Sequence, residues 1–293
     1  MSNRNPALAA ALVGLLLMAP AMAPSARAQE HILSIGGDVT ETLYALGLGD
    51  RIVAVDTTSQ FPPEALRQKP NVGYMRALSA ESVLSVGAKL IVASDKAGPA
   101  DVVKALKASA AYVEILEDPE PAAIPAKIEA IGQAVGKGDD GRRLADKVRQ
   151  DLAALAAERA KITRPLRALF VLNVQSGRLV VGGTETSADA MLRLCGLDNA
   201  AGSIRGYKPT SDEALLAMQP ELVVVMRSVV NHETGDVAAL PGLAATPAGR
   251  QRNILFVDGG EFLAMGPRVA ASARALMDEA YGRPHPAAAP KGN

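Results

Sequence analysis

The sequence contains one pattern twice: a glycine-tyrosine pair, a short helical segment that begins after a serine, and then an apolar strand. The first copy covers residues 73–93 and the second covers residues 206–225. At a constant spacing, the identical pairs are Ser79 and Ser211, Glu81 and Glu213, Leu84 and Leu216, Leu90 and Leu222, and Val92 and Val224. A unit that recurs in this way predicts two similar lobes, with a cleft between them in which a small molecule can bind.

Short strands alternate with helical segments in both halves of the chain. Strands rich in valine and isoleucine that alternate with helices are typical of α/β folds with parallel sheets. Between the halves, residues 139–162 lack proline and form one apolar helical stripe, made of Leu144, Val148, Leu152 and Leu155. We therefore expect an N-terminal lobe at 29–138, one long backbone helix at 139–162 that joins the lobes, and a C-terminal lobe at 163–284.

Residues 1–28 are predicted to be a secretory signal peptide. Arg4 supplies positive charge, residues 7–23 are apolar, and Ala26-Arg27-Ala28 is a small-x-small cleavage site. Because no cysteine lies at that site, we expect a freely soluble periplasmic protein without a lipid anchor. The proline- and alanine-rich residues 285–293 are expected to form a disordered tail.

Charge and cysteine content exclude several kinds of partner and site. Basic and acidic residues both number 31, so the formal net charge of +0 implies no nucleic acid and no anionic membrane as partner. Cys195 is the only cysteine, which excludes an internal disulfide and a cysteine-based zinc site. Its apolar neighbours predict a buried helix residue, and we expect the protein to be a monomer.

The glycine pairs Gly36-Gly37 and Gly182-Gly183 each follow a strand and precede a helix. Helix N-termini attract anions, but no dinucleotide-binding or P-loop motif is present. The spacing of Asp38 and Glu41 instead predicts a capping box. Since the sequence contains no nucleophile elbow and no Ser/His/Asp set, a secreted α/β hydrolase or chelatase is a less favoured alternative.

Tyr74 lies in the loop that precedes the first repeated helix, and it has two interpretations. It can cover the end of a sheet, or its phenolate can bind ferric iron, since tyrosinate is a known axial ligand of haem. A nearby cation favours the anionic form of a phenol, and Arg76 is close enough in sequence to serve. Arg76 can also pair with a carboxylate of the ligand.

The matching loop of the second lobe carries Tyr207 and Lys208, which can close over a ligand from the other side. Lys208, Arg178 and Arg268 are candidate partners of ligand carboxylates, although solvated surface charge is the alternative for each. His31, His232 and His285 form no metal-spaced cluster. His232, in a polar loop, is the one histidine considered as a second axial ligand.

Glu81 and Glu213 occupy equivalent positions in the first turns of the two repeated helices. An acid there complements the helix dipole by about 0.3–1 kcal/mol, which is one explanation for both. The other is that the two carboxylates, one on each lobe, dock basic residues of a membrane partner.

Taken together, these segments resemble the periplasmic haemin-binding proteins of bacterial ABC importers. These proteins belong to the helical-backbone class that also includes binders of cobalamin and ferric siderophores. The most specific segment is 71–81, with the sequence NVGYMRALSAE; weaker matches are GYKPTSDEAL at 206–215, ALPGLAATPAGR at 239–250 and Gly266-Pro267-Arg268.

The resemblance implies two α/β lobes bridged by a long helix, with haem held between them and Tyr74 as iron ligand. It also implies that Glu81 and Glu213 dock a dimeric permease in the inner membrane. Some members carry a histidine ligand in the second lobe, but residues 173–183 contain none. We therefore expect one haem with Tyr74 as the sole protein ligand; a cobalamin or ferric-siderophore binder of the same class is the alternative.

Overall fold

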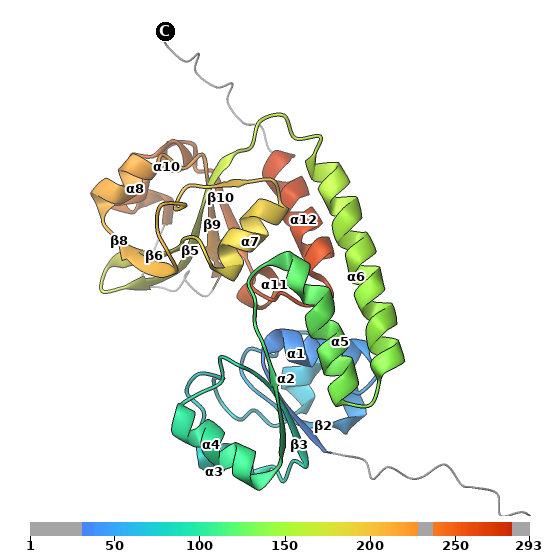
Figure 1. Ribbon diagram of the computed structural model, residues 1–293. Helices are drawn as coiled ribbons and strands as arrows, with labels where there is room; N and C mark the ends of the chain where they lie inside the picture. Colours follow the sequence, from blue (N-terminus) through green and yellow to red (C-terminus); the bar gives the residue numbers. More distant parts are fainter. Residues whose placement is uncertain (1–30, 228–236, 283–293) are drawn as a thin grey trace, which may run out of the picture.

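The computed structural model describes residues 31–227 and 237–282, which form two α/β lobes beside a long helix (Figure 1). The predicted signal peptide and tail lie outside these residues, as do His232 and His285. Within the described ranges, no helix is both long enough and apolar enough to cross a membrane. The predicted fold class, two α/β lobes joined by a long helix, is confirmed.

The N-terminal lobe is built on a parallel four-stranded sheet in the order β2-β1-β3-β4. Its strands are β1 (Ile32–Ile35), β2 (Ile52–Val55), β3 (Leu90–Ser94) and β4 (Ala111–Ile115). Its helices are α1 (Gly37–Ala45), α2 (Glu64–Gln68), α3 (Ala80–Ser85), α4 (Ala100–Ser109) and α5 (Ile124–Ala134). Strands β1 and β3 are fully buried because helices cover both faces of the sheet, which explains their continuous apolar sequence.

The C-terminal lobe is built on a six-stranded sheet in the order β10-β9-β5-β6-β8, with β7 paired to β5. Its strands are β5 (Arg167–Gln175), β6 (Arg178–Gly182), β7 (Asp198–Asn199), β8 (Tyr207–Thr210), β9 (Leu222–Met226) and β10 (Ile254–Val257). Its helices are α7 (Ser187–Leu194), α8 (Asp212–Met218), α9 (Pro241–Ala244), α10 (Pro247–Gln251), α11 (Gly259–Phe262) and α12 (Val269–Tyr281). The stacked rings of Phe170 and Phe262, 4.7 Å apart, lie in its core.

The second sheet differs from expectation in one respect, because it is not parallel throughout. Strand β6 is antiparallel to both β5 and β8. The connection between β5 and β6 consists of Ser176 and Gly177, with φ values of 49° and 75°. A two-residue turn with positive φ at both positions joins antiparallel strands in a tight hairpin, so no crossover helix is possible here.

The lobes are joined by two helices, since α5 packs lengthwise on α6 (Gly138–Arg159). The long helix ends at Arg159, three residues before the expected end at 162, and turns follow it. The two helices approach closely at Gly132 and Gly141: a Cβ atom added to Gly132 would lie 2.9 Å from the Cα atom of Gly141. The pair belongs to both cores, since Ile131 packs in the N-terminal lobe and Ile128 packs in the C-terminal lobe.

Candidate functional site

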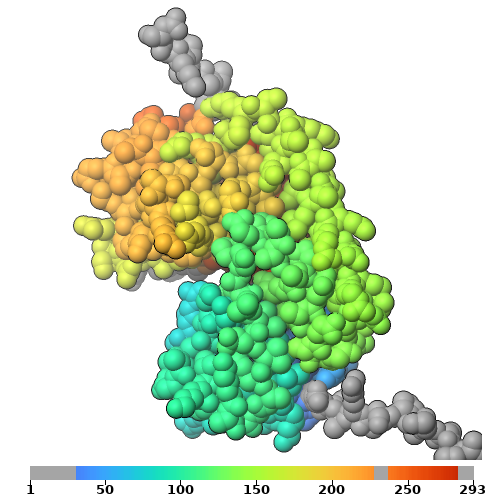
Figure 2. Space-filling view, viewed as in Figure 1, coloured from blue at the N-terminus to red at the C-terminus, as the bar shows by residue number. Residues whose placement is uncertain are grey.

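A hollow opens between the two lobes on the side away from α6 (Figure 2). The cleft at its base has a volume of about 440 Å³ and is lined by residues of both lobes. In the N-terminal lobe it lies beyond the carboxyl ends of β1, β3 and β4, and in the C-terminal lobe beyond those of β9 and β10. Ligands of open α/β sheets bind at this edge, so the cleft is the candidate binding site.

Tyr74 lines the cleft from a loop that backbone hydrogen bonds hold on both sides. Asn71 accepts a hydrogen bond from the backbone N–H of Gly73, whose φ of 99° favours glycine. The backbone N–H of Thr57 donates to the carbonyl of Gly73, and that of Gly98 donates to Met75. The Tyr74 side chain is 46 % exposed, and no described residue is hydrogen-bonded to its hydroxyl. The phenol oxygen is therefore free to contact a ligand.

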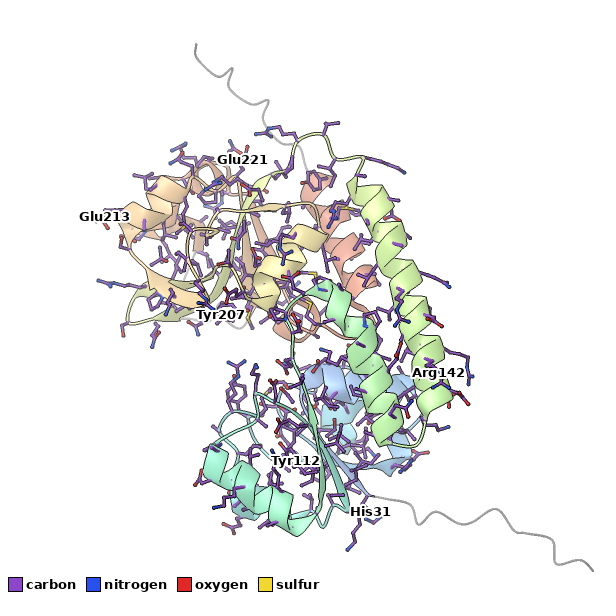
Figure 3. The ribbon with its side chains drawn as sticks, in the orientation of Figure 1. His31, Tyr112, Arg142, Tyr207, Glu213 and Glu221 are labelled. Carbon is purple, nitrogen blue, oxygen red and sulfur yellow. The ribbon has the colours of Figure 1, made fainter. Side chains whose placement is uncertain are left out.

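Arg76 and Tyr207 also line the cleft, as the sequence predicted for ligand-binding residues. Arg76 is exposed and forms no ion pair with a described residue. Tyr207 begins β8 and lies at the edge of the C-terminal lobe that faces the hollow (Figure 3). Its hydroxyl oxygen is 3.2 Å from that of Ser187, and this hydrogen bond holds the tyrosine ring in place. The repeated glycine-tyrosine loops thus both border the cleft.

Several apolar side chains form much of the remaining lining, and sequence reasoning missed them. They come from both lobes and are Met75, Leu172, Met226, Leu263 and Met265. Methionine is flexible and polarisable, so it packs well against flat, irregular or aromatic ligands. The sequence contains no signal for these residues, because an isolated apolar residue in a strand or loop that lines a cleft is indistinguishable from a core position.

A group of charged residues, also missed, lies at the N-terminal side of the cleft. Lys127 of α5 forms an ion pair with Asp38 of α1, and both side chains are more than nine-tenths buried. Burial raises the pKa of the neighbouring Glu117 carboxyl, and Asp38 raises it further, while a hydrogen bond from Ser94 and the charge of Lys127 oppose the rise. This part of the cleft can therefore meet a polar edge of a ligand.

The predicted capping box of Asp38 and Glu41 is wrong. The N-cap of α1 is Gly36, with a φ of 121° and no side-chain cap. Both acids instead make contacts far away in the sequence, since Asp38 pairs with Lys127 and Glu41 pairs with Arg268. A buried carboxylate requires a cation or several donors, and these tertiary partners satisfy that need better than the helix end does.

Three predicted ligand-binding residues do not line the cleft. Arg268 pairs with Glu41 across the lobes, and its guanidinium lies 3.3 Å from the ring centroid of Phe61. Lys208 follows Tyr207 in β8, so the alternation of a strand places it on the opposite face. Arg178 begins β6, next to the hairpin turn. The other end of this strand, Gly182, is the end near the Tyr207 ring, so Arg178 lies at the end away from the cleft.

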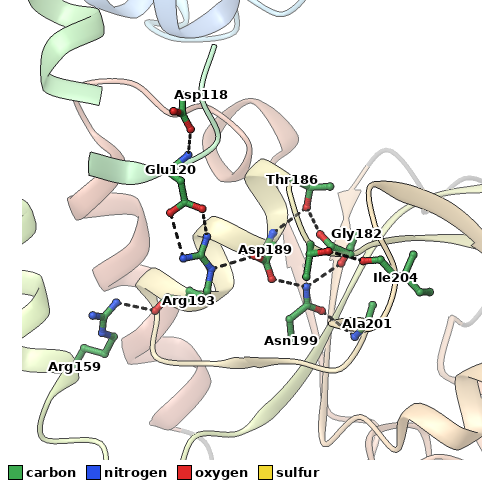
Figure 4. A network of polar contacts seen from close by, with 12 residues as sticks. Asp118, Glu120, Arg159, Gly182, Thr186, Asp189, Arg193, Asn199, Ala201 and Ile204 are labelled. Atoms are coloured by element: carbon green, nitrogen blue, oxygen red, sulfur yellow. Dashed lines mark hydrogen bonds and ion pairs between the residues drawn. The ribbon is translucent and has the colours of Figure 1, made fainter. Parts of the chain in front are cut away.

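A second polar connection between the lobes runs beside the cleft (Figure 4). Glu120, in the segment that leaves β4, pairs with Arg193 of α7 over 2.7 Å. Arg193 in turn donates to Asp189, which accepts from Asn199, and Thr186 accepts from the backbone N–H of Asp189. Since Thr186 lines the cleft, this network fixes part of its wall relative to both lobes.

Glu81 and Glu213 lie outside the cleft, on the exposed sides of α3 and α8. Neither carboxylate forms an ion pair with a described residue. The backbone N–H of Glu213 itself, the Ser211 hydroxyl and the nearby Arg178 lower the pKa of the Glu213 carboxyl. Glu213 lies at the outer extremity of the C-terminal lobe, whereas His31 lies at the end of the N-terminal lobe farthest from the hollow (Figure 3).

No group of three or more histidine, cysteine, aspartate or glutamate residues within 31–227 and 237–282 is arranged to hold a metal ion. Among the side chains that line the cleft, the exposed phenol of Tyr74 is of the residue type that serves as an axial ligand of haem iron.

Sequence comparisons identify the class of protein to which this site belongs. Residues 32–259 match the model of a family described as periplasmic binding protein. An uncharacterised ABC transporter substrate-binding lipoprotein of Bacillus subtilis, YvrC, is 26 % identical over 86 % of this chain and 80 % of its own. A vitamin B12-binding protein of Pectobacterium atrosepticum is 26 % identical over 73 % of this chain and 76 % of its own.

Solved structures with the same fold include two proteins described as haem-binding. The periplasmic heme-binding protein RhuT of Roseiflexus sp. RS-1, in its apo form, is 35 % identical, with a TM-score of 0.82 over 86 % of this chain and 98 % of its own. The periplasmic heme-binding protein HutB of Vibrio cholerae is 32 % identical, with a TM-score of 0.76 over 86 % of this chain and 99 % of its own. The resemblance read from the sequence is confirmed at the level of the family and of these neighbours.

Proposed function

The chain belongs to the periplasmic binding protein family, and we propose that its cargo is an iron porphyrin, haemin, which it captures in the periplasm and delivers to an ABC permease. Family members are solute-binding proteins of ABC transporters rather than enzymes. The observation that supports this cargo best is the exposed Tyr74 phenol in a cleft that methionine and leucine side chains of both lobes also line, beside charged residues.

In the proposed complex, the porphyrin enters the hollow edge-first and lies between the lobes. The Tyr74 oxygen binds the ferric ion as an anion, a hard donor for a hard metal. Arg76, two residues along the same loop, favours that anion or pairs with a propionate. Met226 and Met265 contribute apolar contact from the C-terminal lobe. Tyr207 borders the far side, and Lys96 adds a further cation at the rim.

Delivery requires contact with the permease, and we propose Glu81 and Glu213 for that role. Both carboxylates are exposed, one on each lobe, and neither forms an ion pair with a described residue, although Arg178 lies near Glu213. A dimeric permease offers two equivalent basic sites, which matches two equivalent acids. We further propose that residues 1–28 direct secretion and are then removed, leaving lobes at 29–138 and 163–284 around the helix at 139–162.

A second candidate cargo is cobalamin, which the names of curated relatives favour. Proteins named vitamin B12-binding are about as similar in sequence as YvrC. A cobalamin complex would not need an anionic phenol ligand, since the cobalt of a corrin already carries its own ligands. The two proposals therefore differ in what they require of Tyr74.

A titration separates the candidates. Purified protein is titrated with haemin, cyanocobalamin and a ferric hydroxamate siderophore in turn. Absorption spectra and isothermal titration calorimetry are recorded for each ligand. Binding of haemin with a shifted Soret band, at higher affinity than the other two, supports the proposal. Tighter binding of cobalamin, or of the siderophore, would replace haemin as the cargo.

A further inference from the structure

The two repeated helices present leucines as well as glutamates to solvent. Leu84 of α3 is 48 % exposed and Leu216 of α8 is 43 % exposed. Each leucine follows its glutamate, Glu81 or Glu213, by three residues in the same helix, so glutamate and leucine share one helical face. The leucines are equivalent positions of the internal repeat.

Packing of the two helices does not require these leucines. The preceding residues, Val83 and Leu215, are also equivalent in the repeat, and each is 2 % exposed. They anchor α3 and α8 to their respective cores. Ser79 and Ser211 cap the two helices by accepting from backbone N–H groups. The capping, the buried anchor and the exposed pair are thus all present twice.

Large apolar side chains with this degree of exposure are few among the described residues: Tyr74, Leu84, Leu116, Leu216 and Phe256. The leucine pair is the one related by the repeat. A single exposed leucine is ordinary on a protein surface, but an equivalent pair beside two exposed glutamates indicates a contact that is made twice. The helices lie on different lobes, both on the side of the molecule opposite α6 (Figure 1).

We propose that Leu84 and Leu216 are apolar anchors in the contact with the permease, an inference that rests on the proposed delivery function. Each leucine enters an apolar pocket of one permease subunit, while the adjacent glutamate pairs with a lysine or arginine at the rim of that pocket. A partner with two-fold symmetry supplies two such sites, which is what a surface with an internal two-fold repeat can fill. Burial of the aliphatic side chains provides the affinity, and the charge pairs orient the complex.

The test measures equilibrium association of the cargo-loaded protein with its permease and ATPase complex in nanodiscs. Leu84→Gln and Leu216→Gln are made singly and together, and Glu81→Lys with Glu213→Lys is made as a second double variant. Phe256→Gln is the matched control, because Phe256 is exposed to a similar degree, 38 %, but lies in β10, at the opposite edge of the second sheet from β8. Cargo binding and circular dichroism are recorded for every variant.

We expect each leucine variant to weaken association by about tenfold and the pair by about 100-fold, the loss of one and of two buried aliphatic contacts. Cargo binding should be unchanged, and Phe256→Gln should bind the permease within about twofold of wild type. A double leucine variant that also stays within about twofold overturns the inference. If the double glutamate variant loses association in that case, delivery stands without the leucines; if it too binds normally, the delivery proposal fails with them.

Discussion

Arg268 holds Glu41 with both its main chain and its side chain. Its backbone N–H donates to one carboxylate oxygen over 2.8 Å, and its guanidinium donates to the other over 3.3 Å. Glu41 belongs to α1 of the N-terminal lobe, whereas Arg268 immediately precedes α12 of the C-terminal lobe. The carboxylate is 3 % exposed, so this contact between lobes is shielded from water.

We expect Arg268→Met to destabilise the protein by about 3 kcal/mol at pH 7, because it leaves a buried carboxylate without its cation. Burial already raises the pKa of Glu41 above its ordinary value of 4.5, and Arg268 opposes that rise. A carboxyl with a raised folded-state pKa contributes stability below its unfolded pKa and loses it as the pH rises through the folded value. The cost of Arg268→Met should therefore shrink toward pH 4.5, as measured by urea unfolding between pH 4.5 and 8.

Glu120→Gln is the comparison for that experiment, since Glu120 also links the lobes through an ion pair, with Arg193. Glu120 is 55 % exposed, so the pair is screened by solvent and its loss should cost under about 1 kcal/mol. An equal cost for the two variants, or a cost of Arg268→Met that does not change with pH, would contradict the account of Glu41.

Replacement of Asp38 by asparagine should cost about 3 kcal/mol, because it leaves the Lys127 ammonium in a site that is 6 % exposed. The exposed pair of Lys107 and Glu114 provides a reference, since these side chains are 49 % and 43 % exposed. Glu114→Gln should change the free energy of unfolding by less than about 1 kcal/mol. Denaturant titration of both variants checks the difference, and similar values for the two would show that Asp38 is not needed to compensate Lys127.

Tyr74→Phe should remove the tyrosinate charge-transfer absorption from a haemin complex and weaken haemin binding by at least about 100-fold, because it deletes the iron ligand and keeps the ring. Tyr112→Phe is the control, as Tyr112 is a partly buried tyrosine of β4 that does not line the cleft. Visible absorption during a haemin titration records both effects. A normal spectrum and affinity for Tyr74→Phe would remove the ligand assignment.

Cys195 should resist thiol reagents in the folded protein. It is fully buried directly after α7, where its Sγ atom donates to the carbonyl of Ala273 over 3.3 Å, and burial raises the pKa of the thiol far above its ordinary value. Since only the thiolate reacts, modification should require unfolding. Ala156→Cys on the exposed side of α6 supplies a reactive reference thiol. Rapid labelling of Cys195 with Ellman's reagent in native buffer would contradict this prediction.

Much of the architecture was predictable because it depends on local patterns. The repeat of Ser79 and Glu81 at Ser211 and Glu213 predicted two lobes, and the apolar stripe of residues 139–162 predicted the helix between them. The glycine-tyrosine loops led to Tyr74 and Tyr207, which do line the cleft. These features repeat within short windows of sequence, so periodicity and turn residues suffice to find them.

The contacts that determine the rest of the cleft join residues far apart in the sequence. Asp38 and Glu41 have the spacing of a capping box, but each forms an ion pair with a cation from another element. Asp38 pairs with Lys127, and Glu41 pairs with Arg268. Local spacing cannot reveal a partner that tertiary packing supplies. Lys208, by contrast, could have been set aside from the sequence, because in a strand it must face away from the side on which Tyr207 lies.

The closeness of Gly132 to Gly141 has a consequence for how such a carrier can diversify. The two helices that join the lobes meet backbone to backbone at this point, with no room for a methyl group on Gly132 and little on Gly141. An alanine at Gly132 should push the helices apart, and the lobes that they carry should shift with them. The width of the opening between the lobes, and with it the size of the ligand that fits, can thus change through a substitution at a residue that never contacts the ligand.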